Sequence, residues 1–115
     1  MAAVPPSSPS IPALTAFVEQ KWPSIQTTLE EYIRIPNQSP AFDPEHLTNG
    51  LATKVVDLFS AWVTAQAIPG LKMEVITDPG RTPLMFLEVP ATGGGEGTVL
   101  LYGHAGASFF PERRL

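Results

Sequence analysis

The chain of 115 residues contains no cysteine. Without thiols it has no disulfide, no thiolate nucleophile and no cysteine ligand for zinc, so any metal must be held by histidine and carboxylate side chains. It also has little positive charge, because seven Lys and Arg residues against eleven Asp and Glu residues give a net charge of -4. This balance gives no electrostatic reason to expect nucleic acid or an anionic membrane as a partner.

Long apolar runs are missing as well. No stretch approaches the roughly 18 to 20 apolar residues that span a bilayer, and the N-terminus lacks the basic start and apolar region of a secretory signal. The first arginine is Arg34, so the arginines of a transit peptide are also absent. We therefore expect a soluble, cytoplasmic protein. Its hydrophobic content of 43% is enough for one modest core.

Residues 1–12 have a composition of their own, with four prolines among serine and alanine. Such a segment buries too little apolar surface to offset the entropy lost on ordering. We predict a disordered tail over residues 1–12.

Two amphipathic helices are predicted next. The first begins at Ala13, and its apolar residues recur at steps of three, four and one. Pro23 either kinks this helix or starts a new one within its first turn. The second helix has a start signal at Asp43-Pro44 and continues to about Ile68. The large apolar residues of both stripes, including Trp22, Phe59 and Trp62, are predicted to form the core.

Three strands follow in the prediction. Leu71–Ile76 and Leu84–Val89 flank a turn at Asp78-Pro79-Gly80, and a glycine-rich loop leads to Thr98–His104. The last segment is an apolar run, which suits a strand buried on both faces near the centre of a sheet. The sequence thus predicts an α/β fold of two helices followed by three strands.

His104 ends the last predicted strand and is the main candidate site residue. In open α/β sheets ligands bind beyond the carboxyl ends of strands, so His104 falls where a metal site would form. The alternative is a histidine bonded to nearby backbone. We predict His46 to be a solvated surface residue. Glu30 and Glu31 are predicted to lie on a solvated helix face, because adjacent side chains on a helix point about 100° apart.

Two further motifs lie beside or within the last predicted strand. The run Gly93–Gly97 precedes a strand, whereas a phosphate-binding P-loop follows one, so a loose loop is predicted. The stretch Leu101–Gly106 is loosely similar to the loop that builds the oxyanion hole of serine hydrolases. The only nearby nucleophile is Ser108, which lacks the closing glycine of a nucleophile elbow.

The stretches Arg81–Pro90 and Thr98–His104 resemble the start of the zinc-dependent exopeptidases related to carnosinase, succinyl-diaminopimelate desuccinylase and aminoacylase. The likeness runs from about Leu14 to His104 and includes the Ile35–Pro40 exit of the first helix. The resemblance implies part of a mixed-sheet catalytic domain that uses two zinc ions to hydrolyse dipeptides or N-acyl amino acids, in a homodimer. It also implies that His104 is the first zinc ligand.

The likeness stops after His104. The family pattern continues with an aspartate two positions on, where this chain has Gly106, and the other zinc ligands and the catalytic glutamate lie further along in the family. We therefore expect residues 13–104 to be the N-terminal part of the catalytic domain. Residues 105–115 are expected to be a divergent end, produced by a truncated reading frame, an alternative transcript or a gene-model error.

No catalytic residue is assigned within the chain, and we expect the chain alone to be inactive. Two alternatives stay open. One is a non-catalytic α/β module that binds a partner through an exposed strand such as Val99–Tyr102. The other is a fragment of a serine hydrolase, in which Ser108 would be reactive.

Overall fold

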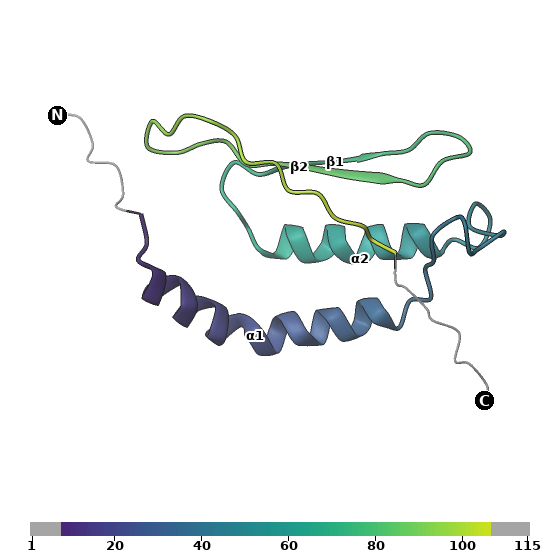
Figure 1. Ribbon diagram of the computed structural model, residues 1–115, viewed down its shortest axis with the longest axis horizontal. Coiled ribbons are helices and arrows are strands. Elements are labelled where there is room, and N and C mark those ends of the chain that lie inside the picture. Colours follow the sequence, from purple (N-terminus) through teal and green to yellow (C-terminus); the bar gives the residue numbers. More distant parts are fainter. Residues whose placement is uncertain (1–7, 107–115) are drawn as a thin grey trace.

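A small α/β fold is seen in the computed structural model, which describes residues 8–106 (Figure 1). Helices α1 (Ile11–Ile33) and α2 (Leu51–Ala65) are followed by strands β1 (Lys72–Ile76) and β2 (Leu84–Glu88). The two strands form an antiparallel ribbon. In Figure 1, α2 lies between this ribbon and α1. Two predicted helices and two of the three predicted strands are therefore confirmed.

Helix α1 begins at Ile11, two residues before the predicted start. The Ser10 hydroxyl accepts a hydrogen bond from the Ala13 N–H at 3.3 Å, and Pro12 lies in the first turn. Serine before the helix and proline inside its first turn are favourable for a helix start. The predicted tail thus overlaps the helix at its end, and residues 1–7 lie outside the described residues.

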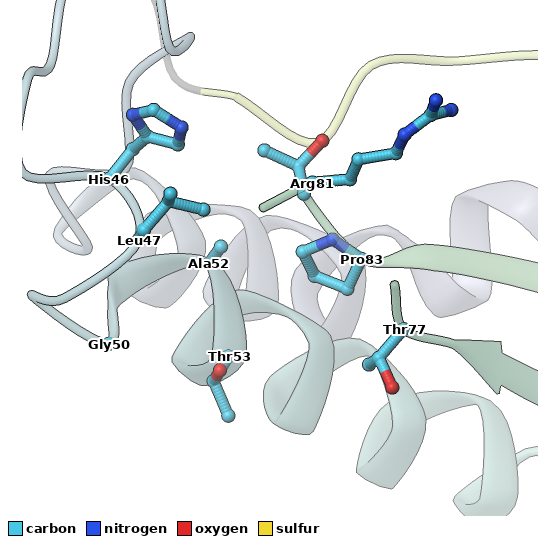
Figure 2. A pocket seen from close by; sticks show the side chains of 9 residues that line it. His46, Leu47, Gly50, Ala52, Thr53, Thr77, Arg81 and Pro83 are labelled. Carbon is cyan, nitrogen blue, oxygen red and sulfur yellow. The ribbon is translucent and has the colours of Figure 1, made fainter. Parts of the chain in front are cut away.

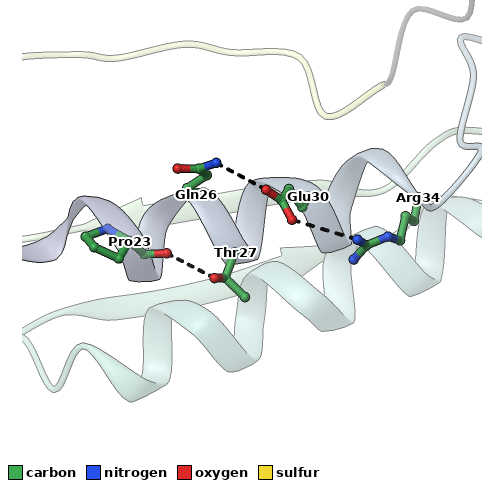
Figure 3. A network of polar contacts seen from close by, with 5 residues as sticks. All are labelled: Pro23, Gln26, Thr27, Glu30 and Arg34. Carbon is green, nitrogen blue, oxygen red and sulfur yellow. Dashed lines mark hydrogen bonds and ion pairs between the residues drawn. The ribbon is translucent and has the colours of Figure 1, made fainter.

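Pro23 lies inside one continuous helix, which bends along its length in Figure 1. Proline has no N–H to donate to the carbonyl of Glu19, four residues earlier. Exposed side chains make local polar contacts along this part of α1 (Figure 3). The Thr27 hydroxyl donates to the Pro23 carbonyl at 3.0 Å. Glu30 accepts from Gln26 at 3.2 Å and lies 3.8 Å from Arg34. The solvated position predicted for Glu30 is confirmed.

Helix α2 begins at Leu51, so the start predicted at Asp43 is wrong. The Asp43 carboxylate accepts from the Glu45 N–H at 3.0 Å and from Asn49 Nδ2 at 2.7 Å, which stabilises turns instead. Gly50 then has a φ of 71°, a left-handed conformation that no helix interior contains. Gly50 is the N-cap residue, and the side chain of Asn49 before it accepts from the Leu51 N–H, the first free donor of the helix, at 3.1 Å.

The core is much smaller than predicted. Val55 in α2 is 1% exposed and is the one fully buried hydrophobic residue of the described chain. The ring of Tyr32 from α1 packs against Phe59 at a centroid distance of 5.1 Å. Trp22 and Trp62 remain 52% and 38% exposed, so their prediction as core residues is wrong. A ribbon of two strands has too little surface to cover two helices, and the first turns of α1 extend beyond α2 in Figure 1.

Strands β1 and β2 pair from Lys72 opposite Glu88 to Ile76 opposite Leu84. The predicted turn between them is confirmed, because the Arg81 N–H donates to the Asp78 carbonyl at 3.0 Å and Gly80 has a φ of 77°. The half-buried residues of the ribbon, Met73 and Met85, share the face toward α2. The outer face carries exposed Ile76, Leu84 and Phe86.

The prediction of a third strand at Thr98–His104 is wrong. Within residues 8–106 this segment is neither strand nor helix, and Val99, Leu100, Leu101 and Tyr102 are 80 to 89% exposed. An apolar run becomes a buried strand only when neighbouring strands accept its N–H and C=O groups. In Figure 1 the segment leaves the glycine-rich loop and passes the ribbon without joining it.

Neither α1 nor α2 is both long enough and apolar enough to cross a bilayer.

Candidate functional site

His104 lies on the exposed segment rather than at the end of a sheet strand. Its imidazole meets the ring of Tyr102 edge to face, with a centroid distance of 5.3 Å and an interplanar angle of 70°. Edge-to-face contacts between rings at this separation are favourable. The side chain two positions earlier therefore orients the candidate ligand.

The backbone just after His104 is held by the loop that follows α1. Asn37 Nδ2 donates to the carbonyl of Ala105 at 3.1 Å, in a half-buried contact between residues 68 positions apart. Beside it, a Cβ built on Gly106 would lie 3.8 Å from the Ser39 backbone nitrogen. The loop after α1 and the segment that carries His104, which both belong to the stretches named in the resemblance, are thus neighbours in space.

The described residues do not by themselves fit a zinc ion. Structural and catalytic zinc sites use three or four protein ligands, and among residues 8–106 no group of three or more His, Cys, Asp or Glu side chains could hold a metal. Gly106 has no side chain with which to support a ligand from the second layer of a metal site. Among the described residues His104 is therefore a single imidazole without companion ligands.

His46 is half-buried, which differs from its prediction as a solvated residue. Its Nδ1 lies 2.8 Å from the carbonyl oxygen of Asp43, within the turns that precede α2. The left-handed Gly50 ends these turns and leads directly into α2. His46 is therefore a histidine bonded to nearby backbone.

A shallow hollow of about 160 Å³ lies between the start of α2 and the turn end of the ribbon (Figure 2). Its wall contains His46, Thr53 and Thr77 together with Arg81, whose guanidinium is paired with Asp78 at 3.3 Å in an exposed contact. Sequence patterns missed this hollow, because it forms only once Asn49-Gly50 interrupts the predicted helix. Its wall contains no residue of Thr98–His104, so it is separate from the candidate ligand.

Glu31 is exposed, as expected of a solvated helix face. Residues 93–97 form an exposed loop, in which the Gly95 N–H donates to the Thr92 carbonyl at 3.2 Å. Ser108 and residues 107–115 of the predicted divergent end lie outside the described residues.

In comparisons with known proteins, no family model matches this chain, and no curated protein matches it either. The likeness to the zinc-dependent exopeptidases therefore stays a prediction from Arg81–Pro90, Thr98–His104 and Ile35–Pro40. Those residues lie on β2, on the loop after α1 and on the segment that ends at His104.

Proposed function

We propose that this chain is the N-terminal part of a cytoplasmic zinc-dependent metallopeptidase or amidohydrolase that hydrolyses dipeptides or N-acyl amino acids. In the proposal His104 is one ligand of a two-zinc centre, and the intact enzyme is a homodimer. The observation that carries it is Tyr102-Gly103-His104, preceded by two helices and the strand Leu84–Glu88. We further propose that the 115-residue chain has no peptidase activity by itself.

The geometry supports this proposal in two ways. The exposed imidazole of His104 is accessible to a ligand, and its backbone is anchored by the bond from Asn37 to Ala105. The apolar residues before it are exposed, as strand residues are when the strands that would cover them belong to another segment. A single imidazole supplies one of the three or four ligands that zinc requires, which explains the expected inactivity.

The first experiment measures zinc-dependent hydrolysis of dipeptides and N-acetyl amino acids by the purified chain. We expect rates equal to those of buffer with the same zinc, and no saturable zinc binding by calorimetry. His104→Ala and His46→Ala are the matched pair, because each removes one imidazole. The proposed inactivity of the chain is contradicted if the chain hydrolyses these substrates, if His104→Ala abolishes the hydrolysis and if His46→Ala preserves it.

A second experiment tests the family directly by sequencing transcripts across the codon of His104. We expect a transcript in which the reading frame continues with aspartate two positions after His104, followed by further histidine and carboxylate ligands. If every transcript encodes Ala105–Leu115 and no other continuation, the family proposal is wrong.

A second candidate function is a non-catalytic α/β module that binds a partner chain. It is favoured by one specific observation, the 80 to 89% exposure of Val99–Tyr102. Exposed apolar patches of this kind mark interaction sites in proteins. A dye that fluoresces on apolar surfaces should bind the chain, and Leu100→Lys should weaken the signal. If the chain does not raise the fluorescence of the dye, it lacks such a surface in solution and this candidate function is wrong.

A further inference from the structure

We propose that Val99–Tyr102 is a donor strand that pairs with the outer edge of β2 in a second copy of this chain. By two-fold symmetry each copy then donates one strand and receives one. The inference rests on the interaction role proposed above and names its partner. It does not depend on whether His104 binds a metal.

The donor has the properties of a strand without a neighbour. Within the described chain, residues 98–104 make no backbone hydrogen bond to any other residue. Successive side chains of an extended segment point to opposite sides, so Val99 and Leu101 would face one way and Leu100 and Tyr102 the other. All four are apolar or aromatic and at least 80% exposed. The segment would therefore be apolar on both faces of any sheet it joined.

The acceptor is β2 rather than β1. In the part of the chain that the structure describes, each strand pairs only with the other, so each has one edge without a partner. Charged side chains on an edge strand oppose pairing with another chain. Strand β1 carries Lys72 and Glu74 among its five residues, whereas β2 has the uninterrupted apolar run Leu84–Leu87 before Glu88. The edge of β2 is thus the less protected of the two.

The structure holds the donor away from the β2 edge of its own copy. The exposed loop of residues 89–97 precedes it, and the bond from Asn37 to Ala105 fixes the chain just behind it. In Figure 1 the segment runs past the ribbon to the loop after α1. A second copy can reach this segment without breaking the contact at Ala105.

The exposed area suits a dimer. At about 60 to 120 Å² for each large apolar side chain, the four donor residues and the half-exposed Leu84, Phe86 and Leu87 offer roughly 330 to 660 Å² per copy. Specific interfaces bury roughly 600 to 1000 Å² per partner, counting polar atoms as well. The apolar area offered by the exchange of two strands therefore overlaps the lower end of the range for a specific dimer.

The first test measures the molar mass of the full chain by light scattering over a range of concentrations. We expect a monomer at low concentration and a dimer at high concentration, with Leu100→Lys raising the dissociation constant about tenfold or more. Phe42→Lys is the matched control, because Phe42 is 78% exposed in a turn and lies outside both strands. A chain that stays monomeric, or a dimer that Leu100→Lys leaves unchanged, overturns the inference.

The second test distinguishes strand pairing from simple apolar contact. A strand paired along one edge donates its N–H groups at alternate residues, and proline removes one N–H. Of Leu100→Pro and Leu101→Pro, one should weaken the dimer about tenfold and the other about threefold or less. Equal effects would show that the copies meet without forming a sheet.

The third test identifies the partner by hydrogen exchange. If a second copy pairs with the donor, protection of the amides of residues 99–102 and of β2 should rise together with protein concentration. Protection that is the same at all concentrations in a monomer means pairing within one chain, which refutes the second copy. A monomer that still binds the dye refutes only this inference, whereas a monomer that does not bind it refutes the interaction role too.

Discussion

Two apolar stretches of this chain, Leu84–Leu87 and Val99–Tyr102, have similar compositions and opposite environments. The first is paired with β1, and Leu84, Phe86 and Leu87 are 43 to 52% exposed. The second has no partner among the described residues and is 80 to 89% exposed. The sequences leading into them differ. The turn at Asp78-Pro79-Gly80 returns the chain directly beside β1, whereas the loop before Val99 contains left-handed Gly93, Gly94 and Gly97 and brings the chain past the ribbon without pairing with it.

In this chain the turn before each apolar run decides whether the run becomes a strand. Apolar composition supplies the tendency to be buried, but a strand needs an adjacent edge with matching donors and acceptors. A tight turn brings that edge within a few residues. A glycine-rich loop leaves the choice of partner open, which is why a second chain can supply it.

The largest expected difference between the two stretches is in the free energy of unfolding after a carboxylate is placed in each. Met85→Asp should lower the free energy of unfolding by about 2 kcal/mol, because it puts a charge on the half-buried face toward α2. Leu101→Asp should change it by about 0.5 kcal/mol or less. Urea unfolding followed by circular dichroism, at concentrations where the chain is monomeric, measures both. Equal losses would mean that Val99–Tyr102 is packed in solution.

A smaller difference in stability is expected between alanine substitutions of Gly80, which precedes the first stretch, and Gly103, which follows the second. Gly80→Ala should destabilise the chain by about 1 kcal/mol, since alanine is strained at a φ of 77°. Gly103→Ala should lie within about 0.5 kcal/mol of the parent, since among residues 8–106 no atom beyond its chain neighbours lies within 4 Å of the added Cβ and its φ is not left-handed. Thermal unfolding of the two variants compares them directly. A larger loss at Gly103 would indicate a close neighbour there.

The smallest expected effect is on the pH dependence of stability, through Tyr32, whose ring packs between the two helices. Burial raises the pKa of the Tyr32 hydroxyl above its ordinary value of 10.0. The folded chain then keeps this proton where the unfolded chain loses it, so the contribution to stability is complete below pH 10.0 and declines as the pH rises above it.

Tyr32→Phe should therefore reduce the loss of stability between neutral and strongly alkaline pH. Tyr102→Phe is the control, because the Tyr102 ring is 80% exposed and lies outside the packed helices. Urea unfolding at several pH values gives both profiles. An alkaline loss that Tyr102→Phe reduces as much as Tyr32→Phe would place the two tyrosines in similar environments.

Local signals predicted much of the fold. The apolar periodicity of residues 13–33 and the turn at Asp78–Gly80 are confirmed because each depends on residues a few positions apart. The start of α2 was misplaced because Asp43 fits both a helix cap and a turn, and Gly50 decided between them. The buried third strand could not be judged from its own residues, since burial depends on neighbours elsewhere in the chain.

The candidate site was less predictable. A histidine after an apolar run is visible in any sequence, but the contact of Asn37 with Ala105 joins loops 68 residues apart, and no periodicity or motif indicates it. The exposure of Trp22 was missed for a similar reason. A helical stripe shows which residues can be buried together, whereas the amount of surface available to cover them is a property of the assembled fold.

The hydrogen bond from Asn37 to Ala105 also has a consequence for the order of folding. Closing a loop of 68 residues costs roughly 3 to 4 kcal/mol of chain entropy in a flexible chain, whereas one hydrogen bond contributes about 1 kcal/mol. We therefore expect the bond to form after the helices and the hairpin have shortened the effective loop. The hairpin closes over a few residues and can form early. A probe at Ala105 should then report a late step of folding, in which the chain around His104 reaches its final place.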